Sequence, residues 1–197
     1  MKHIKKFRLV ESAEWEEGKF SYRDDVPVDI LTKLSKSDNQ DILTAVAAHP
    51  NTPEEVLIDL SNNPNYVVRA WTASNQNLPY DILEKFTSDE SDLIRAFAAG
   101  QSRLSPEILD RLSKDPKAMV RSRVLGNPSI TPEIAANYDN EEDTSVKIEM
   151  AMCSKISITI LRKLMKDPDS EVRRIAKRFI EFRPEKDDIL DGWLGEF

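Results

Sequence analysis

Three acidic residues alternate along one stretch of the chain, at Asp139, Glu141 and Asp143. Carboxylates at alternating positions supply the first ligands of a calcium-binding loop, which also needs glycine at its sixth position and glutamate at its twelfth. Thr144 and Met150 stand at those two positions instead. The sequence therefore predicts that this stretch does not hold calcium.

Other residues able to act as a nucleophile, a base or a metal ligand are few. The chain has two histidines, His3 and His49, and one cysteine, Cys153. His49 and Cys153 occupy the same position of a 26-residue repeat, and the copies between them carry Asn75, Gln101 and Asn127. A position shared by an imidazole, amides and a thiol is typical of a polar helix end. We expect His49 to be such a group and Cys153 to be an inert thiol.

Sequence motifs of common enzymes are missing from the chain. It has no phosphate-binding P-loop, no dinucleotide-binding glycine motif, no nucleophile elbow and no HExxH zinc motif. Its 5 glycines leave little for a phosphate-binding loop. We therefore expect a protein without enzymatic activity and without a metal ion or cofactor.

A second recurring chemical feature pairs an acidic or amide residue with a basic residue six positions later. An acid at the start of a helix is favoured by the helix dipole, and its oxygens can cap free N–H groups. Stacked copies would bring each acid close to a base of a neighbouring copy. The pattern predicts a structural ladder rather than a binding site. Its pairs are Asn63–Arg69, Asp89–Arg95, Asp115–Arg121, Glu141–Lys147 and Asp167–Arg173.

These pairs belong to a repeat of 26 residues that covers most of the chain. One column of the repeat reads Leu31, Leu57, Leu83, Leu109, Ala135 and Leu161, and another reads Ile42, Val68, Ile94, Val120, Val146 and Val172. Six copies in register are typical of a protein whose units stack along one axis and bury a continuous core. Such proteins mostly serve as binding scaffolds.

Each copy contains two short segments with helical periodicity. The first follows a proline, which suits the first helical position because it lacks an N–H; these are Pro27, Pro53, Pro79, Pro106 and Pro132. Thr52 and Thr131 precede two of them as candidate N-caps. The second segment, for example YVVRAWTASN, follows a polar break. Because apolar residues do not alternate at period two, we expect helices and no strands.

The pattern N-P-x-T-P-x-x-x-L-x-x-L, followed by D and V-R, resembles the leucine-rich repeat variant family and is also similar to short HEAT repeats. The best matches run from His49 to Arg69 and from Leu104 to Arg121. The resemblance covers about residues 26–180. It implies a right-handed, superhelical α-solenoid of alternating short helices, either α with 3₁₀ or α with α. Some members carry an iron–sulfur cluster on four N-terminal cysteines, but the first 150 residues here contain no cysteine.

Some columns on the second helix vary freely among the copies and therefore mark an exposed face. In the middle copies this face carries apolar residues with an arginine beside them, a composition typical of protein-binding surfaces. We expect this face to form the inner surface of the solenoid and to bind a protein or peptide partner. Two alternatives are that the aromatic residues are core, or that Trp15, Phe20 and Tyr22 of the N-terminal segment cover them. The candidate site is Val67, Trp71, Leu93, Phe97, Met119 and Arg123.

The charges give an alternative function. Net charge is −7, and residues 26–80 hold three bases against six acids, which disfavours a dedicated nucleic-acid surface. Residues 156–180 are basic, however, with seven bases against three acids. We interpret the last copy as a solvated end of the array, with nucleic-acid binding by a HEAT-like, DNA-glycosylase-like groove as the alternative. Its candidate residues are Arg173, Arg174, Lys177 and Arg178.

The sequence divides into three parts around the repeat. Residues 1–25 are expected to form a cap segment, residues 26–180 the six-repeat solenoid, and residues 181–197 an acidic tail or cap whose DDILDGWLGEF segment is amphipathic. No apolar run reaches the roughly 20 residues needed to span a bilayer. The N-terminus lacks the apolar region of a signal peptide. Together with the single cysteine, these features favour a cytoplasmic protein without a membrane partner.

Overall fold

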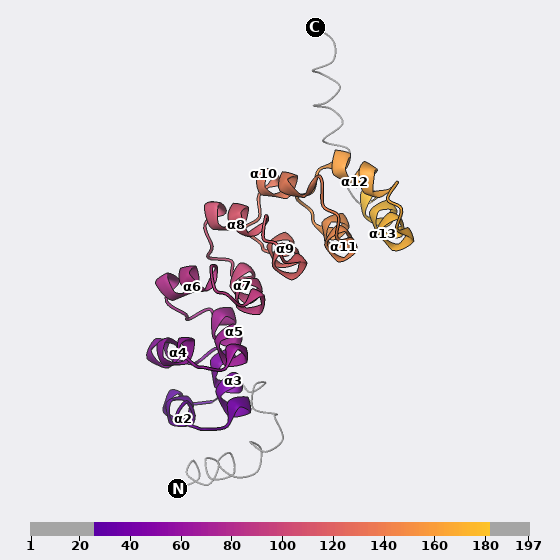
Figure 1. Cartoon of the computed structure of the whole chain (residues 1–197). Coiled ribbons are helices and arrows are strands. Elements are labelled where there is room, and N and C mark those ends of the chain that lie inside the picture. The colour runs from indigo at the N-terminus through magenta and orange to yellow at the C-terminus, as the bar shows by residue number, and fades with distance from the viewer. Residues whose placement is uncertain (1–25, 182–197) are drawn as a thin grey trace. The chain divides into compact units, whose positions relative to one another are not determined.

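The computed structural model describes residues 26–181, and within them the chain forms twelve α-helices, one short 3₁₀ helix and no strand (Figure 1). The expected caps at residues 1–25 and 182–197 lie outside the described residues. The chain divides into two compact units, and the boundary between them in the sequence lies between Gln101 and Ser102. An all-α helical repeat is therefore confirmed. Within the described residues, no helix is long and apolar enough to cross a membrane.

The first unit contains three helix pairs. The first helices of the pairs form one layer, and the second helices, which pack successively on one another, form the other layer (Figure 1). The pairs are α2 (Val28–Leu34) with α3 (Gln40–Ala48), α4 (Glu54–Ser61) with α5 (Tyr66–Ser74), and α6 (Tyr80–Phe86) with α7 (Asp92–Ala99).

The second unit repeats this arrangement. Its second helices again pack in sequence, α9 on α11 and α11 on α13. The pairs are α8 (Pro106–Leu112) with α9 (Ala118–Leu125), α10 (Pro132–Ala135) and η2 (Ala136–Tyr138) with α11 (Thr144–Met152), and α12 (Ile158–Leu164) with α13 (Ser170–Ile180).

The predicted core columns are buried in both units. Every member of the Leu31 column has no exposed surface, and in the Val68 column five of six members have none, Ile42 being half-buried. Because these side chains recur on one stripe of each short helix, each pair is amphipathic and must pack on its neighbours to bury that stripe. The hydrophobic core thus runs between the two layers.

The starts of the first helices follow the 26-residue period more strictly than the prolines do. Pro27, Pro53 and Pro79 are N-caps rather than first helical residues, whereas Pro106 and Pro132 are first residues behind capping side chains. Ser105, Thr131 and Ser157 supply these caps by accepting hydrogen bonds from N–H groups three residues on. The N-cap prediction is confirmed for Thr131.

For Thr52 the same prediction is wrong. This side chain is fully buried, and its hydroxyl donates to the carbonyl of Val46, 2.5 Å away. It therefore ties the end of α3 to the loop that leads into α4. A residue with a hydroxyl before a proline predicts a cap only when the helix begins at that proline, and α4 begins one residue later, at Glu54.

The acids of the predicted ladder lie two residues before the N-cap position where they were expected. Helix α7, for example, begins three residues after Asp89, whose carboxylate accepts a 2.8 Å hydrogen bond from the Ser91 N–H. In the other repeats the side chain at the equivalent position likewise accepts a hydrogen bond from the backbone N–H two residues later. These side chains are Ser37, Asn63, Asp115, Glu141 and Asp167. The acids therefore close the turn between the two helices, and the N-cap is the residue two positions later, such as Asn65 or Asp143.

Candidate functional site

The candidate partner-binding face in the first unit lies on α5 and α7. Val67 and Trp71 are one helical turn apart on α5, and Leu93 and Phe97 occupy the equivalent positions on α7. The ring centroids of Trp71 and Phe97 are 5.3 Å apart with an interplanar angle of 63°. This edge-to-face geometry is a favourable arrangement for aromatic pairs. The structure therefore brings four of the six predicted residues onto two adjacent helices.

Exposure distinguishes this face from the core. Trp71 is 38% exposed, whereas Val68, Ala70 and Ala73 on the same helix are buried. Val67, Leu93 and Phe97 are half-buried. The alternative that Trp71 is core is therefore wrong within the described residues. The other alternative, a cover formed by Trp15, Phe20 and Tyr22, lies outside them.

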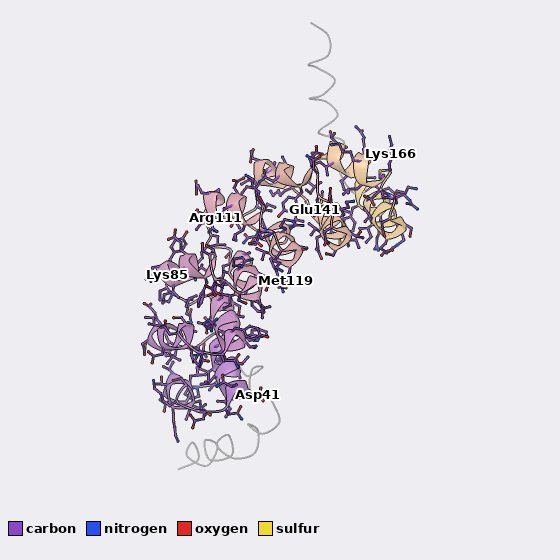
Figure 2. The ribbon with its side chains drawn as sticks, viewed as in Figure 1. Asp41, Lys85, Arg111, Met119, Glu141 and Lys166 are labelled. Carbon is purple, nitrogen blue, oxygen red and sulfur yellow. The ribbon has the colours of Figure 1, made fainter. Side chains whose placement is uncertain are left out.

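The remaining two predicted residues, Met119 and Arg123, lie on α9 of the second unit. Met119 is 42% exposed (Figure 2), and Arg123 is exposed four residues further along the same helix. Their equivalents on α11 are Ser145 and Glu149, both exposed and polar. Within the second unit the same helix face therefore carries one apolar and one basic residue on α9 and only polar residues on α11.

The alternative basic cluster lies on α13. Arg173 donates hydrogen bonds of 2.7 Å to the carbonyls of Asp167 and Pro168, so its guanidinium is occupied by its own turn. Arg174 forms an exposed ion pair with Glu171, which raises the arginine pKa through the hydrogen bond and lowers that of the glutamate. The predicted solvent exposure of this end is confirmed for Arg174, Lys177 and Arg178. Two of the four bases thus have structural partners.

The predicted ladder is present at two steps of the second unit. Arg121 on α9 holds Glu141 through two hydrogen bonds of 2.7 Å, from Nε and Nη2 to the two carboxylate oxygens. Lys147 on α11 lies 2.9 Å from the carboxylate of Asp167. Both acid side chains are almost buried, with 7% and 8% exposure. The ladder joins successive repeats, which is a structural role.

The basic partners of Glu141 and Asp167 help to lower the pKa values of these two carboxyls. Burial alone would raise the pKa of Glu141, but hydrogen bonds from Arg121 and from the Asp143 N–H outweigh it and lower the pKa. The pKa of Asp167 is lowered in the same way, by the Asp169 N–H and Lys147 against burial. Both carboxylates are therefore held ionised at neutral pH by their neighbours in the fold.

The three alternating acids considered for calcium have separate partners. Asp139 forms an ion pair with Lys163, Glu141 binds Arg121, and Asp143 caps α11 through the N–H groups of Ser145 and Val146. No group of three potential metal ligands occurs in the described part of the chain. Each of the three carboxylates therefore has a structural role, in an ion pair or in a helix cap.

A ladder of buried amides was missed by reasoning from the sequence. The Asn75 amide nitrogen donates to the carbonyls of Ala47 and His49, at 2.8 and 2.9 Å, and Gln101 repeats this toward Ala73 and Asn75. His49, which is fully buried, accepts from the Asn51 N–H through Nδ1. The expectation of a helix-end polar group is confirmed for His49, and Cys153 at the equivalent position is also buried.

Comparison with known proteins supports the fold and gives no activity. No protein-family model and no curated protein matches the chain. Among solved structures, the chain is similar to one described as a leucine-rich repeat variant with a novel repetitive protein structural motif, with a TM-score of 0.57 and 26% identity. The match covers 85% of this chain and 66% of that one. The likeness agrees with the resemblance seen in the sequence and indicates a helical-repeat scaffold.

Proposed function

We propose that this protein is a non-catalytic binding module of the cytoplasm, and that a protein or peptide partner binds the face formed by α5 and α7. The observation that carries the proposal is the partly exposed Trp71 ring, packed edge-to-face on Phe97. Val67 and Leu93 extend the same face. We call these four residues the aromatic face.

The physical chemistry of the aromatic face favours a macromolecular partner. Large aromatic side chains give much contact area for little loss of conformational entropy, and they dominate the binding energy of many protein interfaces. Asp41 and Ala45 occupy the equivalent positions on α3, where Asp41 is exposed (Figure 2). The fold therefore tolerates polar and small residues at these positions, so packing of the repeat does not require Trp71.

A pull-down from native cell extract tests the proposal. The full-length chain, Trp71→Ala and Tyr66→Ala would each be immobilised, and the proteins retained would be identified by mass spectrometry. Tyr66 is the matched control, because it is a 53% exposed aromatic residue on the same helix, about 140° around the helix axis from Trp71. We expect one protein to be retained by the wild type and by Tyr66→Ala, and lost with Trp71→Ala.

Direct binding must then be shown with the purified partner, for instance by titration calorimetry. Retention of the same proteins by all three variants would contradict the proposal. Recovery of nucleic acid, with an affinity that falls steeply as salt rises, would favour the alternative at Arg173, Arg174, Lys177 and Arg178. Alanine substitution of Lys177 and Arg178 would then identify that surface, since both are exposed.

A further inference from the structure

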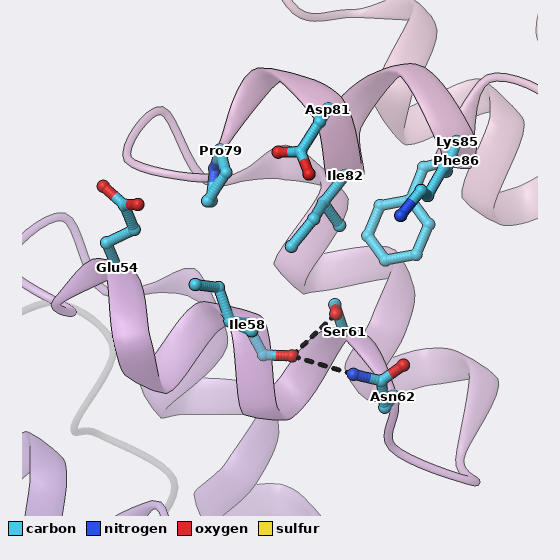
Figure 3. Close-up of a pocket in the computed structure, with 9 residues that line it drawn as sticks. All are labelled: Glu54, Ile58, Ser61, Asn62, Pro79, Asp81, Ile82, Lys85 and Phe86. Carbon is cyan, nitrogen blue, oxygen red and sulfur yellow. Dashed lines mark hydrogen bonds between the residues drawn. The ribbon is translucent and has the colours of Figure 1, made fainter.

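A groove lies between α4 and α6, on the layer of first helices in the first unit (Figure 3). These two helices pack on α5 and α7 rather than closely on each other, which leaves the space between them open. The groove has a volume of about 480 Å³, which lies in the range of small-ligand sites. Ile58 points into it from α4 and Ile82 from α6, and Phe86 lines one end.

One apolar residue of the groove, Ile58, has no apolar counterpart of similar size in the other repeats. Ile58 is 39% exposed, and the equivalent residues of the other five repeats are small or polar: Thr32, Glu84, Asp110, Ala136 and Arg162. Ile82 is half-buried, as is its equivalent Ile30, whereas the equivalents Val56, Ile108, Ile134 and Ile160 are buried. Exposed aliphatic surface in a concave site marks a place where an apolar group can be buried on binding.

The two helices that form the groove are acidic, and the groove itself is lined by two carboxylates and one lysine. Helices α4 and α6 carry five acids against one base, and Glu54 and Asp81 line the groove itself. Neither of these two carboxylates forms an ion pair with any residue in the range 26–181 that the structure describes. Figure 3 shows both on the Pro79 side of the groove, with Lys85 and Phe86 at the other end. Carboxylates without an ion-pair partner beside an apolar floor favour a ligand that carries positive charge next to an apolar group.

We propose that this groove is a second binding site, and that it takes a peptide segment of a partner protein in which basic residues flank large aliphatic ones. The aliphatic side chains pack between Ile58, Ile82 and Phe86. The basic side chains approach the carboxylates of Glu54 and Asp81. This site lies on the layer opposite the aromatic face and is independent of it.

Fluorescence anisotropy with labelled synthetic peptides tests the proposal on the full-length chain. The probe is the peptide GSKRLIKSG. The first control peptide, GSKRAAKSG, keeps the charge and removes the aliphatic pair, and the second, GSEELIESG, keeps the pair and reverses the charge. We expect the probe to bind, the first control to bind at least about tenfold more weakly, and the second not to bind.

Two pairs of substitutions separate the groove from general attraction to an acidic protein. The variant Glu54→Gln with Asp81→Asn removes two charges from the groove, and the variant Glu55→Gln with Glu84→Gln removes two charges from the same helices outside it. Net charge changes equally in both. We expect the first to weaken probe binding about tenfold and the second less than about twofold. Equal weakening by both would overturn the proposal.

Charge reversal gives a gain of function that a folding defect cannot imitate. With Glu54→Lys and Asp81→Lys together, the acidic peptide GSEELIESG should bind and the basic probe should not. Trp71→Ala should leave binding of the basic probe unchanged, because that side chain lies on the other layer. Failure of every peptide to bind the wild type, or loss of probe binding in Trp71→Ala, would overturn the groove assignment.

Discussion

Asn75 connects two successive repeats through its side-chain amide. It is 4% exposed, donates to two carbonyls of the preceding repeat, and accepts from the Asn77 N–H. Asn75→Ala would leave these buried groups without their partner, so we expect unfolding free energy to fall by about 2–4 kcal/mol. Urea unfolding followed by circular dichroism measures this. Gln76→Ala, at the exposed neighbouring position, should change stability little, and an equal loss there would contradict the assignment.

The Arg121–Glu141 pair is the clearest ion pair of the ladder. Its side chains are 17% and 7% exposed, so removing the arginine leaves an almost buried carboxylate without its partner. We expect Arg121→Ala to lower the unfolding free energy by about 1–3 kcal/mol. Arg174→Ala, which breaks a solvent-exposed pair in the same unit, is the control and should have little effect in the same urea titration. Similar losses in both variants would show that burial does not set the strength of the pair.

For individual residues, the sequence predicts whether a position is polar, charged or apolar better than it predicts which atoms that residue contacts. The acid–base columns predict charge pairs between repeats, and Arg121 with Glu141 confirms them. The helix-end column predicts a polar group, but the partners of Asn75 are backbone carbonyls of the preceding repeat. Every residue supplies a carbonyl, so nothing in the sequence marks which ones are acceptors. The sequence did contain one indication of this ladder. Amides recur at this repeat position, as Asn75, Gln101 and Asn127, close to the apolar core columns.

Among the helices, α5 has one buried side and one partly exposed aromatic residue. Because Trp71 is 38% exposed, we expect Trp71→Ala to lower the unfolding free energy by about 1–2 kcal/mol. Leu83→Ala, at a fully buried position of α6, should cost about 2–5 kcal/mol. Chemical unfolding of the two variants compares them directly. A cost for Trp71→Ala as large as that for Leu83→Ala would show that the ring is part of the core.

Helix boundaries followed the period of the repeat rather than the prolines. Stepping by 26 from Pro79 leads to Ser105, Thr131 and Ser157, which are all N-caps, so the register was present in the sequence. The prolines suggested that three helices begin one residue too early, because proline is accepted at the N-cap as well as at the first helical position. Neither position needs a backbone N–H. The short 3₁₀ helix at Ala136–Tyr138 had no such signal.

For the molecule as a whole, the repeat predicts six helix pairs, and the structure has six within residues 26–181. The division into two compact units at Gln101 and Ser102 was not visible in the sequence, because the core columns continue through it. The face proposed to bind a partner was also only partly predictable. Free variation between repeats identified an exposed helix face, but exposure of a particular ring such as Trp71 depends on how the neighbouring side chains pack.

Two carboxyls whose pKa values are lowered in part by a base of the preceding repeat, Glu141 by Arg121 and Asp167 by Lys147, both lie in the second unit. A pKa that is lower in the folded than in the unfolded chain contributes stability above the unfolded value, about 4 for these groups, and this stability is lost as the pH falls through the folded value. The amide ladder of Asn75 and Gln101 in the first unit does not titrate in this range.

Acid should therefore open the second unit more than the first. Hydrogen exchange read by mass spectrometry, with rates corrected for the intrinsic effect of pH, should show protection in residues 102–181 falling between about pH 5 and pH 3. Protection in residues 26–101 should change less. In the variant Glu141→Gln with Asp167→Asn, the second unit should be less protected at neutral pH and should lose less protection on acidification than the wild type, because two of the titrating groups have been removed. Equal loss in both units of the wild type would show that the ladder does not control the response to acid.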